Sequence, residues 1–90
     1  MEMKSESKPP KELVEPESTL QRDGKSFLLR FKLPDIRGMS DINIMKFPNS
    51  LELRARIKDK MYFKLMKLPE NLSIINQSFE KGMLTIEMVE

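Results

Sequence analysis

The stretch Ser78–Met88 reads SFEKGMLTIEM and predicts the last hairpin of a β-sheet. Two apolar-rich halves flank Lys81-Gly82, and a glycine at such a point is typical of a tight turn between strands. In the second half, Leu84, Ile86 and Met88 alternate with polar residues and so share one face. We therefore expect two antiparallel strands here.

The same alternation extends back to Ser18 in short segments that are separated by turns. After a turn at Asp23-Gly24, residues 27–33 alternate until Pro34, which cannot donate to a ladder and ends the strand. Residues 51–57 alternate most regularly, with Leu, Leu, Ala and Ile inward and charged residues outward. Further strands are predicted at 41–47, 61–68 and 74–80. About seven short strands without a helix predict an all-β fold, an antiparallel β-sandwich.

Residues 1–17 differ from the rest of the chain. They carry alternating charges and three prolines, with only Leu13 and Val14 suited to a core. Such a segment buries too little apolar surface to offset the entropy of ordering it. We expect a flexible charged tail over residues 1–17 and one domain over residues 18–90.

Composition argues against several classes of function. The chain has no histidine and no cysteine, the usual neutral-pH base, thiol nucleophile and metal ligands, so we expect no enzyme, no catalytic residue, no metal and no cofactor. No apolar run could span a bilayer, and cysteine-free composition fits the cytoplasm. The basic row Arg54, Arg56 and Lys58 lacks interleaved aromatics, so a solvated strand face is favoured over nucleic-acid binding.

Three anchors in order carry a family resemblance: FLLRFKLP with DINI soon after, YFKLMKLPENL, and SFEKGMLTI. Together they resemble the α-crystallin domain of small heat-shock proteins over residues 18–88. The resemblance implies an immunoglobulin-like β-sandwich of the α-crystallin/CS type. Asp35, after the first Leu-Pro, stands where the family usually has glycine. The closing motif of the family is matched by Gly82, Leu84 and Ile86, and its aromatic/basic strand by Tyr62, Lys64, Met66 and Leu68.

The resemblance implies a stress-response chaperone, an ATP-independent holdase that binds exposed apolar segments of unfolding client proteins. The client groove would lie between the strands at 41–47 and 74–80 and would use Ile44, Met45, Ile75 and Phe79; burial in the core is the alternative. Residues 61–68 carry apolar side chains on both faces, which indicates either dimerisation through Tyr62, Lys64, Met66 and Leu68 or burial.

Two departures from the family bear on assembly. Lys58-Asp59-Lys60 is too short for the strand-exchange loop of many members, and the chain stops at Glu90 without the Ile-x-Ile/Val extension that builds large oligomers. We therefore expect a monomer or dimer rather than a large oligomer. A compact sandwich of this kind is also similar to the CS domains of co-chaperones, so the alternative function is an adaptor that binds one folded partner, such as a chaperone or an ATPase.

Overall fold

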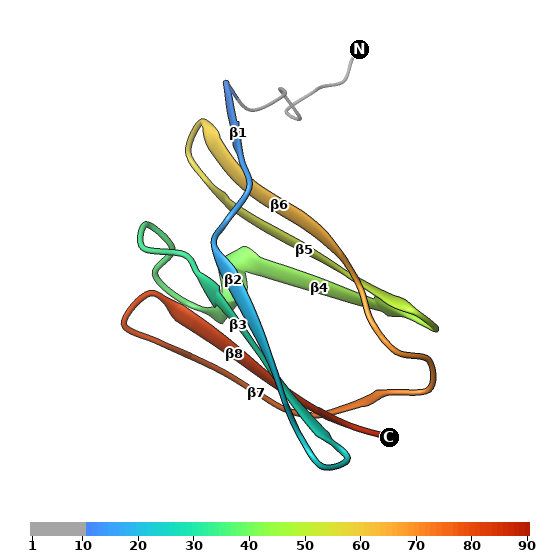
Figure 1. The fold of residues 1–90 in the computed structure, drawn as a ribbon. Helices are drawn as coiled ribbons and strands as arrows, with labels where there is room; N and C mark the ends of the chain where they lie inside the picture. The colour runs from blue at the N-terminus through green and yellow to red at the C-terminus, as the bar shows by residue number, and fades with distance from the viewer. Residues whose placement is uncertain (1–10) are drawn as a thin grey trace.

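The computed structural model describes residues 11–90, which form eight strands and one short 3-10 helix (Figure 1). The 3-10 helix, η1, covers Met39–Asp41 in the connection between the third and fourth strands. The strands are β1 (Glu12–Val14), β2 (Ser18–Asp23), β3 (Ser26–Lys32), β4 (Ile42–Phe47), β5 (Ser50–Ile57), β6 (Lys60–Lys67), β7 (Ser73–Glu80) and β8 (Met83–Val89).

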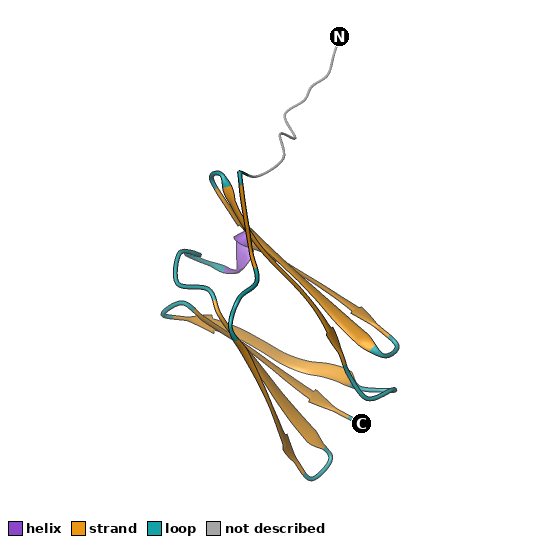
Figure 2. Ribbon diagram, turned by 45° about the horizontal axis from the view of Figure 1, so that its top comes forward, coloured by secondary structure: helices purple, strands orange, loops and turns teal. Residues whose placement is uncertain are grey.

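The strands form two four-stranded layers that pack face to face (Figure 2). Sheet A has the order β1-β6-β5-β4, and sheet B has the order β2-β3-β8-β7. Every neighbouring pair is antiparallel except β1 and β6, which run parallel. The predicted antiparallel β-sandwich is therefore confirmed, with eight strands in the described chain instead of about seven.

The core lies between the sheets and follows from the alternation along each strand. In β5, Leu51, Leu53 and Ala55 point inward, while Glu52 and Arg54 point to the outer face. The described chain buries no polar or charged residue. Fourteen hydrophobic residues make up the core: Phe27, Leu29, Phe31, Leu33, Ile36, Leu51, Leu53, Ala55, Tyr62, Leu68, Leu72, Leu84, Ile86 and Met88.

The expected tail over residues 1–17 needs correction at its C-terminal part. Residues 11–17 belong to the fold, because β1 pairs with β6 from Glu12 opposite Lys60 to Val14 opposite Tyr62. Val14 packs against the core, and Pro16 is buried. The backbone of Glu12 donates to the carbonyl of Asp59 at 3.0 Å. The remainder of the expected tail, residues 1–10, lies outside the described residues.

The strand orders also define two open sides of the sandwich. β1 and β2 end the two sheets on one side, and only residues 15–17 join them (Figure 1). β4 and β7 are the last strands of sheets A and B on the opposite side. This arrangement brings the two segments that were expected to form a client groove to one side of the molecule.

Candidate functional site

The four predicted groove residues divide into two half-buried and two exposed side chains. Ile44 lies opposite Leu53 on the inner face of sheet A, and both Ile44 and Phe79 pack against the core. Met45, the next residue along β4, points to the outer face and is 46% exposed. Ile75 on β7 is 56% exposed. We call these four residues the β4–β7 edge.

A β-bulge explains the exposure of Ile75. The pairing of β7 with β8 shifts between Ile74 and Asn76, so Ile75 is the extra residue and has no partner on β8. A bulge turns its extra residue out of the ladder and bends the strand. A prediction from alternation along 74–80 assumes an unbroken strand. Because the bulge shifts the inward and outward positions within that strand, the sequence pattern could not predict that Ile75 is exposed.

The β4–β7 edge is an apolar surface and not a closed cavity. The open pockets beside the β5–β6 turn, the β2–β3 hairpin and the start of β2 lie elsewhere on the described chain, and none of them is lined by any of the four residues. Each of the two strands also has one side with no ladder partner among the described residues. Exposed backbone donors and acceptors combined with apolar side chains suit the capture of an extended peptide segment.

The residues expected at a dimer interface on β6 point into the sandwich. Tyr62 and Leu68 are buried, and Met66 is half-buried against the core. Lys64 shares this inward side and forms an ion pair with Glu15, on the link between β1 and β2. Moreover, β1 covers part of the edge of β6, so β6 is an inner strand over Lys60–Tyr62. The apolar surface that β6 presents outward comes from its other face.

Gly82, the first residue of the closing motif, lies against the first Leu-Pro anchor, Leu33-Pro34. Leu84 and Ile86 are fully buried, and Gly82 has a φ of +77° at the turn between β7 and β8. The Leu33 amide donates to the Gly82 carbonyl at 2.7 Å. A Cβ atom on Gly82 would lie 3.2 Å from the Cα atom of Pro34. Two of the three motifs that carried the family resemblance therefore meet in space at this end of the sandwich.

An ionic cluster at this end of the molecule was not predicted from the sequence. The Lys60 ammonium donates to the Asp35 carboxylate at 2.5 Å, and the Tyr62 hydroxyl donates to the same oxygen at 3.2 Å. The Lys60 ammonium also lies 4.9 Å from the centre of the Tyr62 ring. The available signal was Asp35 itself, an acid directly after Leu-Pro at a position where the family usually has glycine.

The cluster shifts the pKa of both charged partners. The hydrogen bond from Lys60 and then its positive charge hold the pKa of Asp35 below its usual value, and the Tyr62 hydroxyl adds to this effect. The hydrogen bond to Asp35 raises the pKa of Lys60 above its usual value. Both groups are therefore charged at neutral pH, and they tie the loop after β3 to the start of β6.

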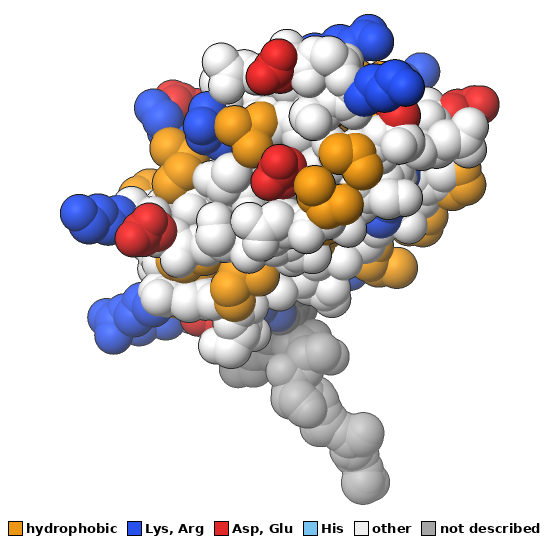
Figure 3. Space-filling view, turned by 90° about the horizontal axis from the view of Figure 1, so that it is seen from below, with side chains coloured by type: hydrophobic (Ala, Val, Ile, Leu, Met, Phe, Trp, Pro, Cys, Tyr) orange, Lys and Arg blue, Asp and Glu red, His pale blue; other side chains and the backbone are white. Residues whose placement is uncertain are grey.

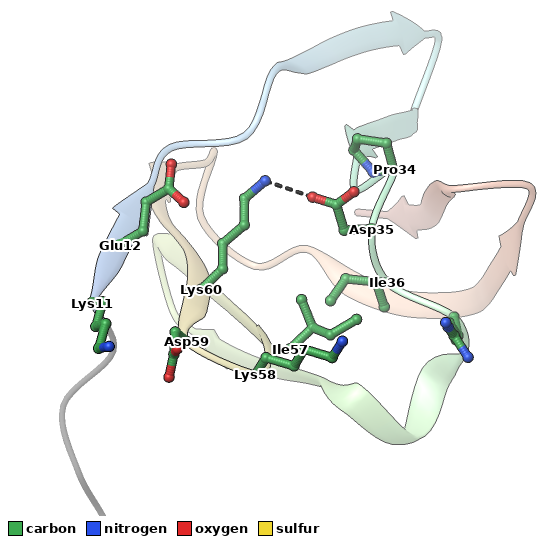
Figure 4. A pocket seen from close by; sticks show the side chains of 10 residues that line it. Lys11, Glu12, Pro34, Asp35, Ile36, Ile57, Lys58, Asp59 and Lys60 are labelled. Carbon is green, nitrogen blue, oxygen red and sulfur yellow. Dashed lines mark hydrogen bonds and ion pairs between the residues drawn. The ribbon is translucent and has the colours of Figure 1, made fainter.

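A cavity of about 570 Å³ opens beside this cluster (Figure 4). The loop after β3, the β5–β6 turn and the start of β1 surround it, and the Lys60 side chain reaches across to Asp35. Its lining mixes four basic with three acidic side chains, so it presents no field of a single sign: Lys11, Arg37, Lys58 and Lys60 against Glu12, Asp35 and Asp59.

Residues 11–90 contain no group of three or more histidine, cysteine, aspartate or glutamate side chains that could hold a metal ion. No helix within the same residues is long and apolar enough to cross a membrane.

Comparison with solved structures identifies the fold. AgsA from Salmonella typhimurium, a small heat shock protein truncated at both termini, matches with a TM-score of 0.67 and 20% identity, over 86% of this chain and 100% of that one. HSP18.5 from E. histolytica matches with a TM-score of 0.72 and 17% identity, over 86% and 88% of the chains. The hspA protein from Xanthomonas axonopodis matches with a TM-score of 0.71 and 19% identity, over 86% and 94%.

No protein-family model matches this chain, and no curated protein matches it significantly. The likeness to the solved structures establishes the fold, which is that of the α-crystallin domain. The resemblance predicted from the three sequence anchors is confirmed at this level.

Proposed function

We propose that this chain, which has the α-crystallin fold, is an ATP-independent holdase of the small heat-shock type. It binds exposed apolar segments of unfolding proteins and slows their aggregation, without catalysis and without a cofactor. The observation that carries the proposal is the match of 86% of the chain to solved small heat shock proteins. The exposed side chains of the β4–β7 edge support it, because they offer apolar atoms beside unpaired strand backbone.

The β4–β7 edge suits weak, reversible capture. Methionine side chains repack around partners of varied shape, and Met45 is well exposed. Lys46 brings a charge onto the inward side of β4, and the bulge at Ile75 interrupts β7. Both features hinder the continuous addition of further strands. A client segment would therefore gain a few apolar contacts here without seeding an extended sheet.

Assembly and location complete the proposal. We propose a monomer or dimer, since β1 already covers Lys60–Tyr62 at the edge of β6 and leaves only the remainder of that strand open to a partner. We also place the protein in the cytoplasm, which a chain without cysteine suits. Sedimentation velocity across micromolar concentrations tests the oligomeric state. A sedimentation coefficient that corresponds to more than two chains would contradict a monomer or dimer.

Light scattering of a heat-denaturing client tests the function. We expect this protein at several-fold molar excess to suppress the rise in scattering, and the double variant Met45→Ser/Ile75→Ser to suppress it less. Leu20→Ser is the control, because it removes a partly exposed hydrophobic residue outside the β4–β7 edge. Unchanged client aggregation at several-fold excess of the wild-type protein would sink the holdase proposal.

A further inference from the structure

The outer face of sheet A carries most of the exposed large hydrophobic residues of the described chain. Seven such residues are found, and four of them lie on this face: Leu13, Met45, Phe47 and Leu65. Met61 and Phe63 add half-buried side chains between them. On the side of sheet B, seen from below in Figure 3, hydrophobic side chains stand as separate spots among charged and neutral groups. The two faces of the sandwich therefore differ in character.

The strand registers order this face into columns. Met61, Phe63 and Leu65 form an apolar column along β6. Arg56, Arg54 and Glu52 lie directly opposite them on β5 and form a mainly basic column beside the first. Neighbouring strands are about 4.8 Å apart, so apolar and cationic groups run side by side along the same length. The guanidinium of Arg54 lies 5.7 Å from the centre of the Phe63 ring, which joins the two columns.

The charges on this face select the kind of partner. Among the described residues of this face, Glu52 is the only acidic one, and its carboxylate is 2.8 Å from Arg54. Three basic residues, Arg54, Arg56 and Lys67, leave the face with a formal charge of +2. Two copies of the chain packed through this face would bring like charges together. A partner with carboxylates next to its apolar side chains would complement both columns.

We propose that the outer face of sheet A binds an acidic amphipathic helix. The apolar stripe of the helix would lie on Met61, Phe63 and Leu65, and glutamates on one flank of that stripe would reach Arg54 and Arg56. Met61 to Lys67 spans about 20 Å of strand, which corresponds to a helix of about 13 residues. A helix is about 10 Å wide and so covers two neighbouring columns.

This inference goes beyond the holdase proposal, and the two can fail separately. Peptide binding is measured on the folded protein without an unfolding client. The substitutions that test peptide binding are made at Leu65 and Arg54, which are not among the four residues of the β4–β7 edge. Loss of one activity in these variants with retention of the other would show that the two surfaces act independently.

Fluorescence anisotropy with two labelled peptides of about 14 residues tests the proposal. Both carry leucines at helical spacing on one stripe, flanked by glutamates in the first peptide and by lysines in the second. We expect the glutamate peptide to bind at least about tenfold more tightly, with an affinity that falls as salt rises. Equal affinity for the two peptides would overturn the proposal.

Matched substitutions locate the binding. Leu65→Ser and Arg54→Gln should each weaken binding of the glutamate peptide by about threefold or more. Leu20→Ser and Arg30→Gln make the same chemical changes on sheet B and should leave it within about twofold. Leu65 is 58% exposed and the Arg54 side chain 55% exposed, so both variants should fold, which thermal unfolding checks.

Two results of these substitutions would overturn the proposal. One is that neither Leu65→Ser nor Arg54→Gln changes the affinity for the glutamate peptide. The other is self-association of the wild-type protein that Leu65→Ser abolishes and that excludes the peptide, because the face would then be occupied by a second copy of the chain.

Discussion

Gly82 joins the closing hairpin to the Leu-Pro turn, and this contact can be tested against a matched glycine. Gly82 and Gly24 both have positive φ, +77° and +64°. A Cβ atom on Gly82 would approach the Pro34 backbone at 3.2 Å, whereas one on Gly24 would have no neighbour within 4 Å. A side chain at either position would therefore pay the cost of a positive φ, but only a side chain at position 82 would also press against the Pro34 backbone.

We expect Gly82→Ala to destabilise the fold more than Gly24→Ala. An L-residue in this conformation costs about 1–2 kcal/mol, and a forced contact in a packed region adds about 1–3 kcal/mol. Gly24→Ala should therefore lose about 1–2 kcal/mol and Gly82→Ala about 2–5 kcal/mol of unfolding free energy. Urea unfolding of both variants measures the difference. Equal losses would show that the contact with Pro34 does not matter.

The ion pair of Asp35 and Lys60 gives stability a defined pH dependence. The pKa of Asp35 is lowered in the fold, so its contribution is present above the ordinary value of 3.8 and is lost as pH falls through the lowered value. The pKa of Lys60 is raised, so its contribution is present below the ordinary value of 10.5 and is lost as pH rises through the raised value. Between about pH 5 and pH 9 the pair should contribute a constant amount.

Asp35→Asn tests this dependence. Its Tm should lie below that of the wild-type protein at neutral pH, because the carboxylate that accepts from Lys60 and Tyr62 is replaced by a neutral amide. The difference should begin to shrink below about pH 3.8, where the carboxyl of the unfolded chain takes up a proton, and should be lost only below the lowered pKa of the folded carboxyl. A difference in Tm that stays constant down to pH 2 would contradict the assignment, because another effect of the substitution would then be responsible.

The edge strand β4 carries one charged residue, Lys46, on its otherwise apolar inward side. Lys46 lies opposite Leu51 on the inward side, in line with Ile42 and Ile44. Its ammonium donates to the Phe47 carbonyl at 2.5 Å and remains near the rim of the sandwich. An inward charge on an edge strand discourages pairing with a second sheet, because such pairing would desolvate it.

We expect Lys46→Ile to promote association of the protein. The substitution leaves a continuous apolar series on the inward side of β4 and removes the charge that opposes edge pairing. Sedimentation velocity at rising concentration should show association of the variant at concentrations where the wild-type protein does not change. Lys46→Arg keeps the charge and should behave as wild type. Association of both variants, or of neither, would contradict this role for Lys46.

The elements that sequence could predict are those with a local signal. Seven strands follow from alternation and from turn residues, both of which act between near neighbours in the chain. β1 could not be found this way, because Glu12-Leu13-Val14 is too short to show a period and its partner β6 is distant in sequence. The side chains of β6 pose a different problem. Both faces are apolar, and only the register with β5 decides that Tyr62 points inward and Leu65 outward.

At the scale of the whole molecule, the arrangement of the sheets concentrates exposed apolar groups on two neighbouring surfaces. The β4–β7 edge and the outer face of sheet A share Met45, which lies at their boundary. Sequence predicted the four residues of the edge but not their unequal exposure. That difference arises from the pairing of Ile44 with Leu53 and from the bulge at Ile75, both of which depend on strands brought together by folding.

The order of the strands places Met45 and Ile75 on the last strands of the two sheets. If β4 and β7 were inner strands, Ile75 and Met45 would lie beside other strands and not at an edge. Because both strands end their sheets, each keeps one side without a ladder partner among the described residues. We propose that clients bind at this edge, on a fold shared with solved small heat shock proteins.

Hydrogen–deuterium exchange of the protein, alone and mixed with a heat-unfolded client, tests this proposal. We expect slower exchange in β4 and β7 when the client is present, because the bound segment shields the free side of these strands. Exchange in the β2–β3 hairpin should stay unchanged and serves as the internal control. Protection of the β2–β3 hairpin with none in β4 or β7, or no change anywhere while client aggregation is suppressed, would contradict it.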